Sequence, residues 1–390
     1  MSTVRILLII LAQMTILSTA SPQSLRCAFE DDFPIGVAID ETRLNDRVYV
    51  ELVRTHFTSL TTQDSLKWLP IHSGEHTYNF ARTDRTLKFA ETNGLDVLGH
   101  TLIWHNSLPE WVLGDNPSEQ ILLARMESHI ATLLARYRGR FVGMDVVNEA
   151  ILVDGSLRAS GFQTTIGDDY IRHAFAFAES ADPGLPLIYN DFQIVSAPKR
   201  RRIIQLIEEL RAAGVRIDAV AFQAHWRIDS PPIEAIETAI VEIAAAGVKV
   251  VISELDVDVL PDGWSRRGEH IADMTAEDQA RFDPYAPIRG GIPGEVLQRQ
   301  AARYVELFQI FQKHRDKIGR VTFWGLSDKN SWLNNYPIKG RTNYPLLFDR
   351  DDRGKPALHA LLSLSSVSPV DFVLDERSCQ RGRNDAPHGR

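Results

Sequence analysis

The stretch "RRIIQLIEELRAAGVRIDAVAFQAH", residues 201–225, contains one complete copy of the pattern that decides the fold. Apolar side chains recur at helical spacing in its first half, and Gly214 follows, where a left-handed residue commonly ends a helix. Residues 218–223 then read as a buried strand. The chain repeats this order with a helical pattern up to Gly247 and the strand-like sequence "VKVVISELDV" at residues 248–257. Alternating helices and strands predict a parallel sheet.

Eight short apolar runs fit the strands of this pattern. They lie near Ile35–Ala38, Phe57–Leu60, Asp96–His100, Val142–Val147, Leu187–Tyr189, Ala219–Gln223, Val250–Ser253 and Val321–Trp324. Eight such units predict an α/β protein with a single-domain (β/α)8 TIM barrel. An open doubly wound sheet is the alternative, but it usually carries a Gly-rich phosphate turn after its first strand. The corresponding stretch, "GVAIDETRLND", has no such turn.

Composition narrows the class of partner. The chain has 390 residues, of which 44% are hydrophobic and 24% charged, as is usual for a globular protein, and its formal net charge is −8. Nucleic acid is not an expected partner, because proteins that bind it usually present a basic face. A neutral polymer is compatible with this charge.

The two ends of the chain differ from the middle. Residues 1–20 predict a secretory signal peptide, in which Arg5 precedes an apolar run and Ala20 ends the segment at the expected cleavage point. A membrane anchor is the alternative, but the apolar run is shorter than the roughly 20 residues that a span needs. We therefore expect export, secreted or periplasmic, with no stable membrane association, one domain over residues 21–365, and a polar tail over residues 366–390.

The chain has two cysteines, Cys27 and Cys379, near the ends of the mature protein. In an exported protein such a pair often forms a disulfide, and a closed barrel brings its two ends together. Two unpaired thiols are the alternative. Neither cysteine has a second Cys or His nearby at ligand spacing, so no metal site is expected.

Polar residues gather where the predicted strands end, which is where the active sites of this fold lie. They are His100, Asn148, Glu149, Asn190, Asp191, Gln223, His225, Glu254, Asp256 and Trp324. A single glutamate at such a position is more often a salt-bridged or solvated rim residue. Glu149 and Glu254, however, lie on strands that face each other across the barrel. Two such carboxylates can cleave a glycosidic bond, provided that one is protonated and the other ionised at the working pH.

Several ordered motifs carry a family resemblance. The stretches "GHTLIWH", "DVVNEA", "ISELDV", "TFWGLSDKNSW" and "LNNYPIKGRTNYPLLFDRDDRGKPA" are together similar to the endo-β-1,4-xylanases of glycoside hydrolase family 10. The similarity extends from about Phe33 to Leu362. The resemblance implies a (β/α)8 barrel and a retaining mechanism, in agreement with the strand count.

By position, the resemblance implies that Glu149 is the general acid/base and Glu254 the nucleophile, about 5–5.5 Å apart. Asn148 matches the amide that bonds the sugar 2-hydroxyl, although a helix cap is the alternative for it. His225 matches an imidazole that would bond Glu254 and favour its charged form, with Asp256 holding the ring. A core histidine bonded to backbone is the alternative for His225.

The remaining matched positions would bind substrate. His100 and Gln223 resemble residues that bond the sugar on the glycone side of the cut. The indole rings would bury flat sugar faces, and those at these positions are Trp104, Trp324 and Trp332.

Three places depart from the family pattern. In "SLTTQDSLKW" the usual Glu-Asn pair is replaced by Gln63 and Asp64, while Lys67 and Trp68 are kept. These positions bind the sugar one step further from the cut, so the exchange raises the hypothesis of altered glycone affinity, with neutral compensation as the alternative. The family commonly has Tyr at the position of Phe192 and Arg at the position of Leu98.

We therefore expect an exported, monomeric endo-β-1,4-xylanase that acts on xylan and xylo-oligosaccharides without a metal or organic cofactor. A hydrolase of another β-1,4-linked glucan is the nearest alternative, since it would use the same two glutamates. The alternative from another class is a non-catalytic carbohydrate-binding protein, which would be expected to have lost a catalytic carboxylate; both are present.

Overall fold

A computed structural model describes residues 24–364 of the chain. The predicted signal peptide (1–20), the polar tail (366–390) and Cys379 lie outside the described residues, whereas Cys27 lies on the first helix. The predictions made for the two ends, including the disulfide, therefore stay predictions. No helix in the described part is long and apolar enough to cross a membrane.

The core of the fold is a closed parallel sheet. Its strands are β1 (Ile35–Ile39), β2 (Ser59–Thr62), β3 (Asp96–Trp104), β4 (Gly143–Asn148), β5 (Leu187–Asp191), β6 (Ala219–Phe222), β7 (His225–Arg227), β8 (Lys249–Asp258) and β9 (Ile318–Phe323). The order is β6-β5-β4-β3-β2-β1-β9-β8-β7, and β6 also pairs with β8, which closes the ring. Gly36 on β1 pairs with both Ser59 and Thr322, so the first and last strands meet. The predicted (β/α)8 barrel is confirmed.

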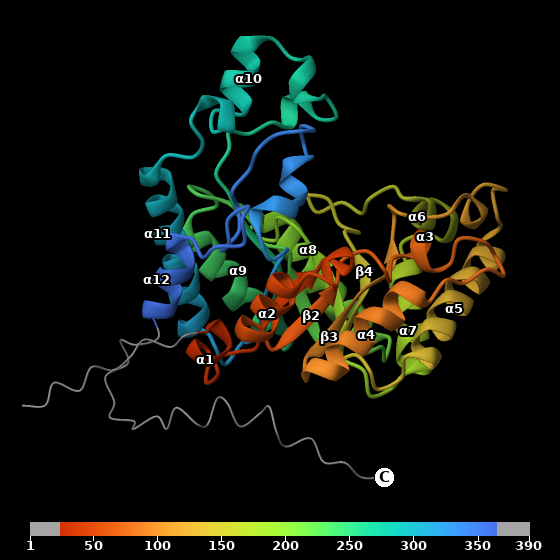
Figure 1. Cartoon of the computed structure of the whole chain (residues 1–390). Helices are drawn as coiled ribbons and strands as arrows, with labels where there is room; N and C mark the ends of the chain where they lie inside the picture. The colour runs from red at the N-terminus through yellow and green to blue at the C-terminus, as the bar shows by residue number, and fades with distance from the viewer. Residues whose placement is uncertain (1–23, 365–390) are drawn as a thin grey trace, which may run out of the picture.

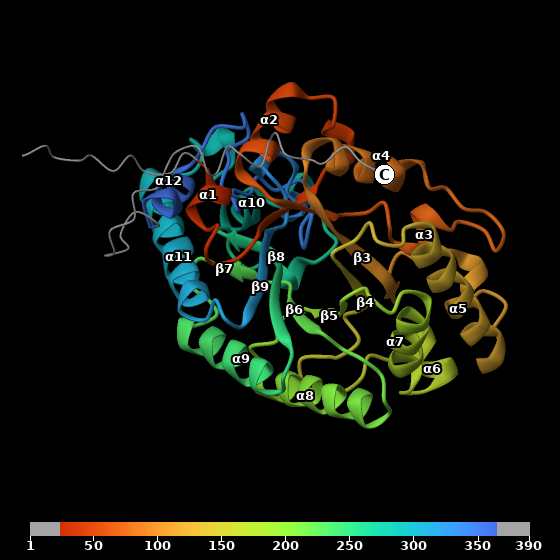
Figure 2. The same ribbon diagram turned by 90° about the horizontal axis from the view of Figure 1, so that it is seen from below.

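The helices form the outer layer. They are α1 (Leu25–Ala28), α2 (Arg47–His56), α3 (Trp68–Ile71), α4 (Ala81–Asn93), α5 (Glu119–Arg136), α6 (Gly161–Ile166), α7 (Tyr170–Ala181), α8 (Ala197–Ala212), α9 (Ile233–Ala245), α10 (Ala276–Phe282), α11 (Gly294–Lys313) and α12 (Pro356–Leu364). Seen from below, most of them surround the strands (Figure 2). The predicted helix ends are confirmed at Gly214 and Gly247, whose φ angles are 72° and 82°.

The strand β6 ends one residue before its predicted end. The run expected to continue to Gln223 leaves the β6 ladder after Phe222, because Ala224 adopts a left-handed conformation with φ 58°. The chain then resumes as the short strand β7, which pairs with the far end of β8. This break places His225 directly opposite Asp256.

The barrel interior contains a small apolar layer. Its members are Leu98, Ile188, Ala219, Ala221 and Val251, all nearly inaccessible to water. Leu98 therefore takes part in hydrophobic packing at the position where the family commonly has an arginine. The larger core fills the space between strands and helices.

The segment between β8 and α11 is a surface insertion of short helices that includes α10. It stands above the rest of the molecule, close to the blue segment that follows β9 (Figure 1). The insertion has only a small apolar cluster: Ile271, Met274 and Phe282 packed on Ile338.

Candidate active site

Glu149 follows directly on β4 and has an unusual backbone. Its φ angle is 57°, a left-handed conformation that a non-glycine residue adopts at some cost. Two hydrogen bonds hold it there: its amide donates to the carbonyl of Asn190 (2.9 Å), and Nε of Arg158 donates to its carbonyl (2.9 Å). In this conformation the carboxyl group of Glu149 contacts the side chains of Trp104 and Gln223.

Both oxygens of the Glu149 carboxyl group are oriented by neighbours. Nε1 of Trp104 donates to Oε2 at 3.0 Å, and Nε2 of Gln223 donates to Oε1 at 3.1 Å. These two donors, one at the end of β3 and the other directly after β6, fix the rotamer of this carboxyl group. It is therefore held ready in one position, as a group that transfers a proton to a bound substrate should be.

Glu254 lies on β8 and is almost completely buried. Its Oε1 accepts a hydrogen bond from Nδ2 of Asn190 at 2.7 Å, and its Oε2 lies 3.1 Å from Nε2 of His225. Burial alone would raise the pKa of Glu254, but the hydrogen bond from His225, together with nearby imidazole charge, outweighs it and the pKa falls below its ordinary value. The carboxylate is thus kept ionised, as a nucleophile requires.

His225 lies between two carboxylates. Its Nδ1 is 2.9 Å from Oδ2 of Asp256, and that oxygen also accepts a hydrogen bond from Nε1 of Trp332 at 2.8 Å. Burial alone would lower the pKa of His225, but Asp256 and Glu254 raise it to about 10. The ring is therefore an imidazolium near neutral pH, and it holds a positive charge against Glu254. The hydrogen bonds that the sequence led us to expect around this ring are present.

Amides connect the two glutamates. The Asn148 side chain lies 3.0 Å from the Asn190 amide and 3.2 Å from the Gln223 amide. Asn190 also bonds Glu254, and Gln223 also bonds Glu149, so one continuous network joins both carboxyl groups. The glutamates therefore lie in a single site, with Asn148 at its centre. Asn148 ends β4 and starts no helix, which argues against the helix-cap alternative.

The other predicted residues line the same end of the barrel. His100 is buried, with Nδ1 2.8 Å from Oδ2 of Asp145, and its ring meets that of Trp324 edge-on at 5.4 Å between centroids. Trp324 itself is only 7% exposed, so little of its ring is open to a ligand. Trp332 is half-buried and lies against His225, with ring centroids 4.7 Å apart.

The segment after β2 carries the main departure from the family pattern. Nζ of Lys67 lies 2.7 Å from Oδ1 of Asp64, whose side chain is 53% exposed. The same ammonium group lies 5.0 Å from the centre of a Trp104 ring. Gln63 is half-buried next to Asp64. Lys67 therefore connects Asp64 with the Trp104 ring that bonds Glu149.

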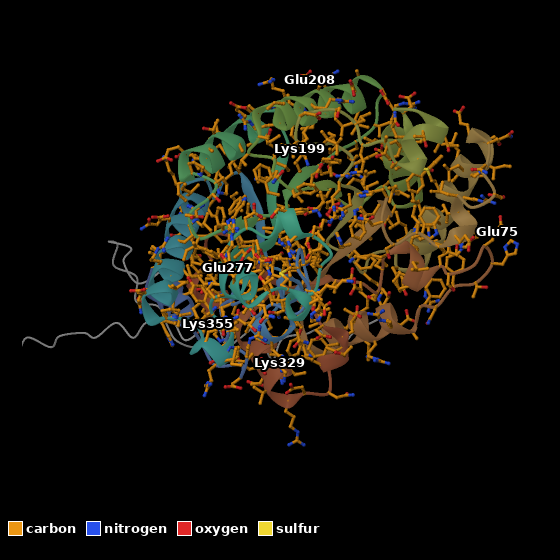
Figure 3. All side chains as sticks on the ribbon, turned by 90° about the horizontal axis from the view of Figure 1, so that it is seen from above. Glu75, Lys199, Glu208, Glu277, Lys329 and Lys355 are labelled. Carbon is orange, nitrogen blue, oxygen red and sulfur yellow. The ribbon has the colours of Figure 1, made fainter. Side chains whose placement is uncertain are left out.

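Sequence reasoning missed two parts of the site. Asn190 was noted at a strand end without a role, although it contacts both Glu254 and Asn148. Lys199, fully buried on α8, forms an ion pair with Asp191 at 2.6 Å. It points inward while Glu208 of the same helix lies at the outer edge (Figure 3). Its Nζ lies 4.1 Å from the centre of the Phe192 ring, the position where the family has a hydroxyl.

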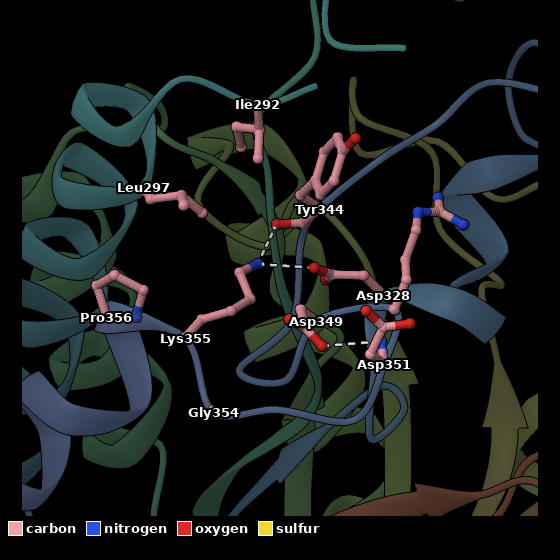
Figure 4. Close-up of a pocket in the computed structure, with 10 residues that line it drawn as sticks. Ile292, Leu297, Asp328, Tyr344, Asp349, Asp351, Gly354, Lys355 and Pro356 are labelled. Carbon is pink, nitrogen blue, oxygen red and sulfur yellow. Dashed lines mark hydrogen bonds and ion pairs between the residues drawn. The ribbon is translucent and has the colours of Figure 1, made fainter. Parts of the chain in front are cut away.

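A separate hollow of about 310 Å³ lies beneath the segment after β9, lined by residues such as Tyr344, Asp349 and Lys355 (Figure 4). Nζ of Lys355 forms an ion pair with Asp328 at 3.0 Å and donates to the carbonyls of Tyr344 and Leu346, both at 2.7 Å. These partners satisfy the hydrogen bonds of the ammonium group. We therefore assign Lys355 a role in the stability of this segment and none in ligand binding. Within residues 24–364 no group of three or more His, Cys, Asp or Glu side chains could hold a metal ion.

A (β/α)8 barrel with two carboxylates at the C-terminal ends of opposite strands, one ionised and both hydrogen-bonded, defines a class: the glycoside hydrolases that work through paired carboxylates. The sequence profile of glycosyl hydrolase family 10 matches residues 24–364. The chain belongs to that family.

Individual relatives agree over nearly the whole domain. The chain is 37% identical over 338 residues to endo-1,4-beta-xylanase A of Xylanibacter ruminicola, covering 85% of this chain and 90% of that protein. It is 37% identical over 353 residues to an endo-1,4-beta-xylanase of Geobacillus stearothermophilus, covering 88% and 99%. A solved endoxylanase of the same family, retrieved from a sugarcane soil metagenome, superposes with a TM-score of 0.82 at 38% identity, covering 87% and 99%.

Proposed function

We propose that this protein is an endo-β-1,4-xylanase that hydrolyses internal bonds of xylan with retention of anomeric configuration. The observation that carries the proposal is that the two glutamates have different hydrogen-bond partners. Glu254 is ionised against His225, while Glu149 is held by neutral donors at the mouth of the barrel. The curated relatives named above are endo-1,4-beta-xylanases and support the choice of substrate.

In the first step, a carboxylate oxygen of Glu254 attacks the anomeric carbon as the bond to the leaving oxygen breaks. Glu149 gives its proton to that oxygen, so the departing sugar leaves as an alcohol. His225 compensates the charge of Glu254 before the attack. As the ester forms, that charge disappears, so the imidazolium then pairs with Asp256.

In the second step, the ionised Glu149 takes a proton from water, and the resulting oxygen attacks the same carbon. The ester bond to Glu254 breaks and both glutamates return to their starting states. Two displacements on one carbon restore its configuration. Asn148, at the centre of the amide network, is positioned to bond the sugar 2-hydroxyl during both steps. These residues and water complete the cycle.

The decisive experiment measures release of reducing ends from xylan, cellulose and mixed-linkage glucan by the purified protein, with Glu254→Ala as control. We expect release from xylan that the variant lacks. Release from a glucan but not from xylan would favour the nearest alternative, a β-1,4-glucanase. No release from any of the three would favour a carbohydrate-binding protein. Proton NMR of the first products should show the β anomer, and an initial α anomer would exclude retention.

We also propose that the chain is exported after cleavage behind Ala20 and acts as a monomer. The signal-like composition of residues 1–20 supports export. N-terminal sequencing of protein recovered from the medium or periplasm should begin at Ser21, and a chain that retains residue 1 in the cytosol would contradict cleavage. Light scattering of the purified protein should give the mass of one chain.

A further inference from the structure

A row of aromatic rings leads from the catalytic residues to the surface. From His225 to Trp332 the centroids are 4.7 Å apart, and from Trp332 to Tyr336 they are 5.2 Å apart with planes inclined by 28°. From Tyr336 to Trp264 they are 5.4 Å apart, and these two rings meet edge to face at 89°. Trp264 begins a short 3-10 helix (Trp264–Arg266) of the insertion and is 55% exposed. A single exposed tryptophan is unremarkable. This one ends a row of contacting rings whose inner end, Trp332, belongs to the candidate active site.

The outer end of this row is rigidly attached to the inner end. The Gly268 amide donates to the Pro337 carbonyl and the Lys339 amide to the Glu269 carbonyl, both at 2.8 Å. Arg341 links the same two segments, because its guanidinium donates to the carbonyls of Pro261 (3.1 Å) and Tyr336 (3.3 Å). The insertion therefore cannot carry Trp264 away from Tyr336 without breaking these bonds.

A guanidinium group lies beside both outer rings. Cζ of Arg267 is 5.6 Å from the Trp264 ring centre and 5.3 Å from that of Tyr336. Its neighbour Arg266 is neutralised by Glu269 at 2.8 Å and Asp278 at 3.2 Å. Among the described residues, no carboxylate lies within ion-pair distance of Arg267. Its exposed fork is therefore open to a carboxylate from outside the chain.

Electrostatics places this group near the chemistry. Burial raises the pKa of the Tyr336 hydroxyl, and the charges of Arg267 and Glu149 both act on it, in opposite directions. The Tyr336 ring also lies 5.2 Å from that of Trp332, whose indole donates to Asp256 beside the nucleophile. A ligand held by Arg267 would lie alongside the sugar chain being cut.

We propose that Trp264, Arg267 and Tyr336 form an accessory subsite for a uronic acid carried as a side group on the xylan chain. The exposed ring of Trp264 would bury the CH face of the pyranose, the ring of Tyr336 would border it edge-on, and Arg267 would bind its carboxylate through parallel hydrogen bonds. The inference rests on the proposed xylanase function and specifies which xylan the cleft prefers. The positive charge of Arg267 favours an acidic side group, because a neutral side sugar would contact the rings but leave the guanidinium unpaired.

The test compares kcat/KM on three substrates: a linear xylo-oligosaccharide, the same chain bearing a glucuronic acid, and that decorated chain with its carboxyl group reduced to an alcohol. The variants are Arg267→Ala and Trp264→Ala. Arg85→Ala, an exposed arginine on the outer helix α4, matches the loss of charge. Ile288→Ala, 91% exposed in the same insertion, matches the loss of apolar surface.

For the parent enzyme we expect the uronate-bearing chain to be preferred over its reduced form by about 1.4-fold to fivefold, the range of one solvent-accessible ion pair. Arg267→Ala should abolish this preference, and Trp264→Ala should lower kcat/KM on both decorated chains. Added salt should weaken the preference of the parent enzyme. Neither control variant should change the ratio.

A parent enzyme that cuts the linear chain but treats the acid and the reduced side group alike would overturn the accessory subsite while leaving the proposed function intact. Equal loss on all three substrates in Arg267→Ala would also overturn it, because that result indicates a structural role. No hydrolysis of any xylan chain would instead contradict the proposed function. The two ideas can therefore fail separately.

Discussion

Nε2 of His225 lies 3.1 Å from Oε2 of Glu254, while Nδ1 of the same ring lies 2.9 Å from Oδ2 of Asp256. One imidazole thus compensates two buried carboxylates. Its position follows from the left-handed Ala224, which ends β6 and starts β7 opposite the end of β8. The break between β6 and β7 therefore places the imidazole that keeps Glu254 ionised.

Stability should fall in mildly alkaline solution. The pKa of His225 is raised from its ordinary 6.5 to about 10. Its contribution is therefore complete below pH 6.5 and is lost as pH rises toward 10. The free energy of unfolding from urea titrations should decline across this window, by at most about 1.4 kcal/mol per pH unit for one proton.

The His225→Gln variant provides the control for this prediction. It should be less stable than the parent near neutral pH, since Glu254 and Asp256 then face each other without a cation, and its stability should be flatter across the alkaline window. Equal slopes for parent and variant would show that another group titrates there.

Replacement of Glu149 by alanine should separate the two catalytic steps. Hydrolysis of xylan should fall by about 10²–10⁴-fold, the usual contribution of a general acid. An aryl xylobioside whose phenol leaves without a proton should still react quickly in the first step and then stall as the ester of Glu254. Azide needs no proton removal, so it should restore turnover and yield a β-glycosyl azide.

Glu254→Ala, in contrast, should be inactive on both substrates and should give no glycosyl azide of β configuration. If azide failed to rescue the Glu149→Ala variant, the assignment of acid/base to Glu149 would be wrong.

The exchanged pair after β2 should affect substrate affinity more than turnover. In this chain the ammonium group of Lys67 is paired with Asp64 at 2.7 Å. Reverting Gln63→Glu with Asp64→Asn removes that bond and frees Lys67 to contact a sugar hydroxyl. We expect KM for xylo-oligosaccharides to fall by about twofold to fivefold, equivalent to one exposed polar contact, with kcat little changed.

Asp316→Asn is the matched control for this pair, because Asp316 also forms an exposed ion pair, with Lys317 at 2.7 Å, but just before β9, at the opposite end of the barrel. An unchanged KM in the double reversion would favour simple compensation between neighbouring residues.

Most of the barrel could be predicted from the sequence, because each strand has a local pattern: a short apolar run followed by a helical repeat and a glycine. The ends of the strands were predicted less well. For example, β3 was expected to end at His100 but continues to Trp104. The break at Ala224 has no sequence signal, since alanine does not favour a left-handed conformation. Asn190 gained its role only from partners far along the chain, Asn148 and Glu254. Local patterns predicted elements, whereas contacts between elements required the structure.

The buried pair of Lys355 and Asp328 should be critical for stability. Both side chains are almost inaccessible to water and lie 3.0 Å apart. Lys355→Met removes the cation and leaves Asp328 buried without its charge partner, which typically costs about 3–5 kcal/mol. Urea unfolding should show this loss. Lys329→Met, an exposed neighbour in the same segment, should stay within about 0.5 kcal/mol of the parent.

A second substitution distinguishes charge from packing at this pair. Asp328→Asn removes the negative charge but keeps an oxygen for the Leu346 amide, which now donates to Oδ1 at 2.8 Å. Added to Lys355→Met, it should recover part of the lost stability, because no uncompensated charge then remains buried. The carbonyls of Tyr344 and Leu346 still lack their donor, so recovery should be incomplete. A double variant no more stable than Lys355→Met would show that these carbonyl bonds, and not the ion pair, stabilise the segment that carries Trp332.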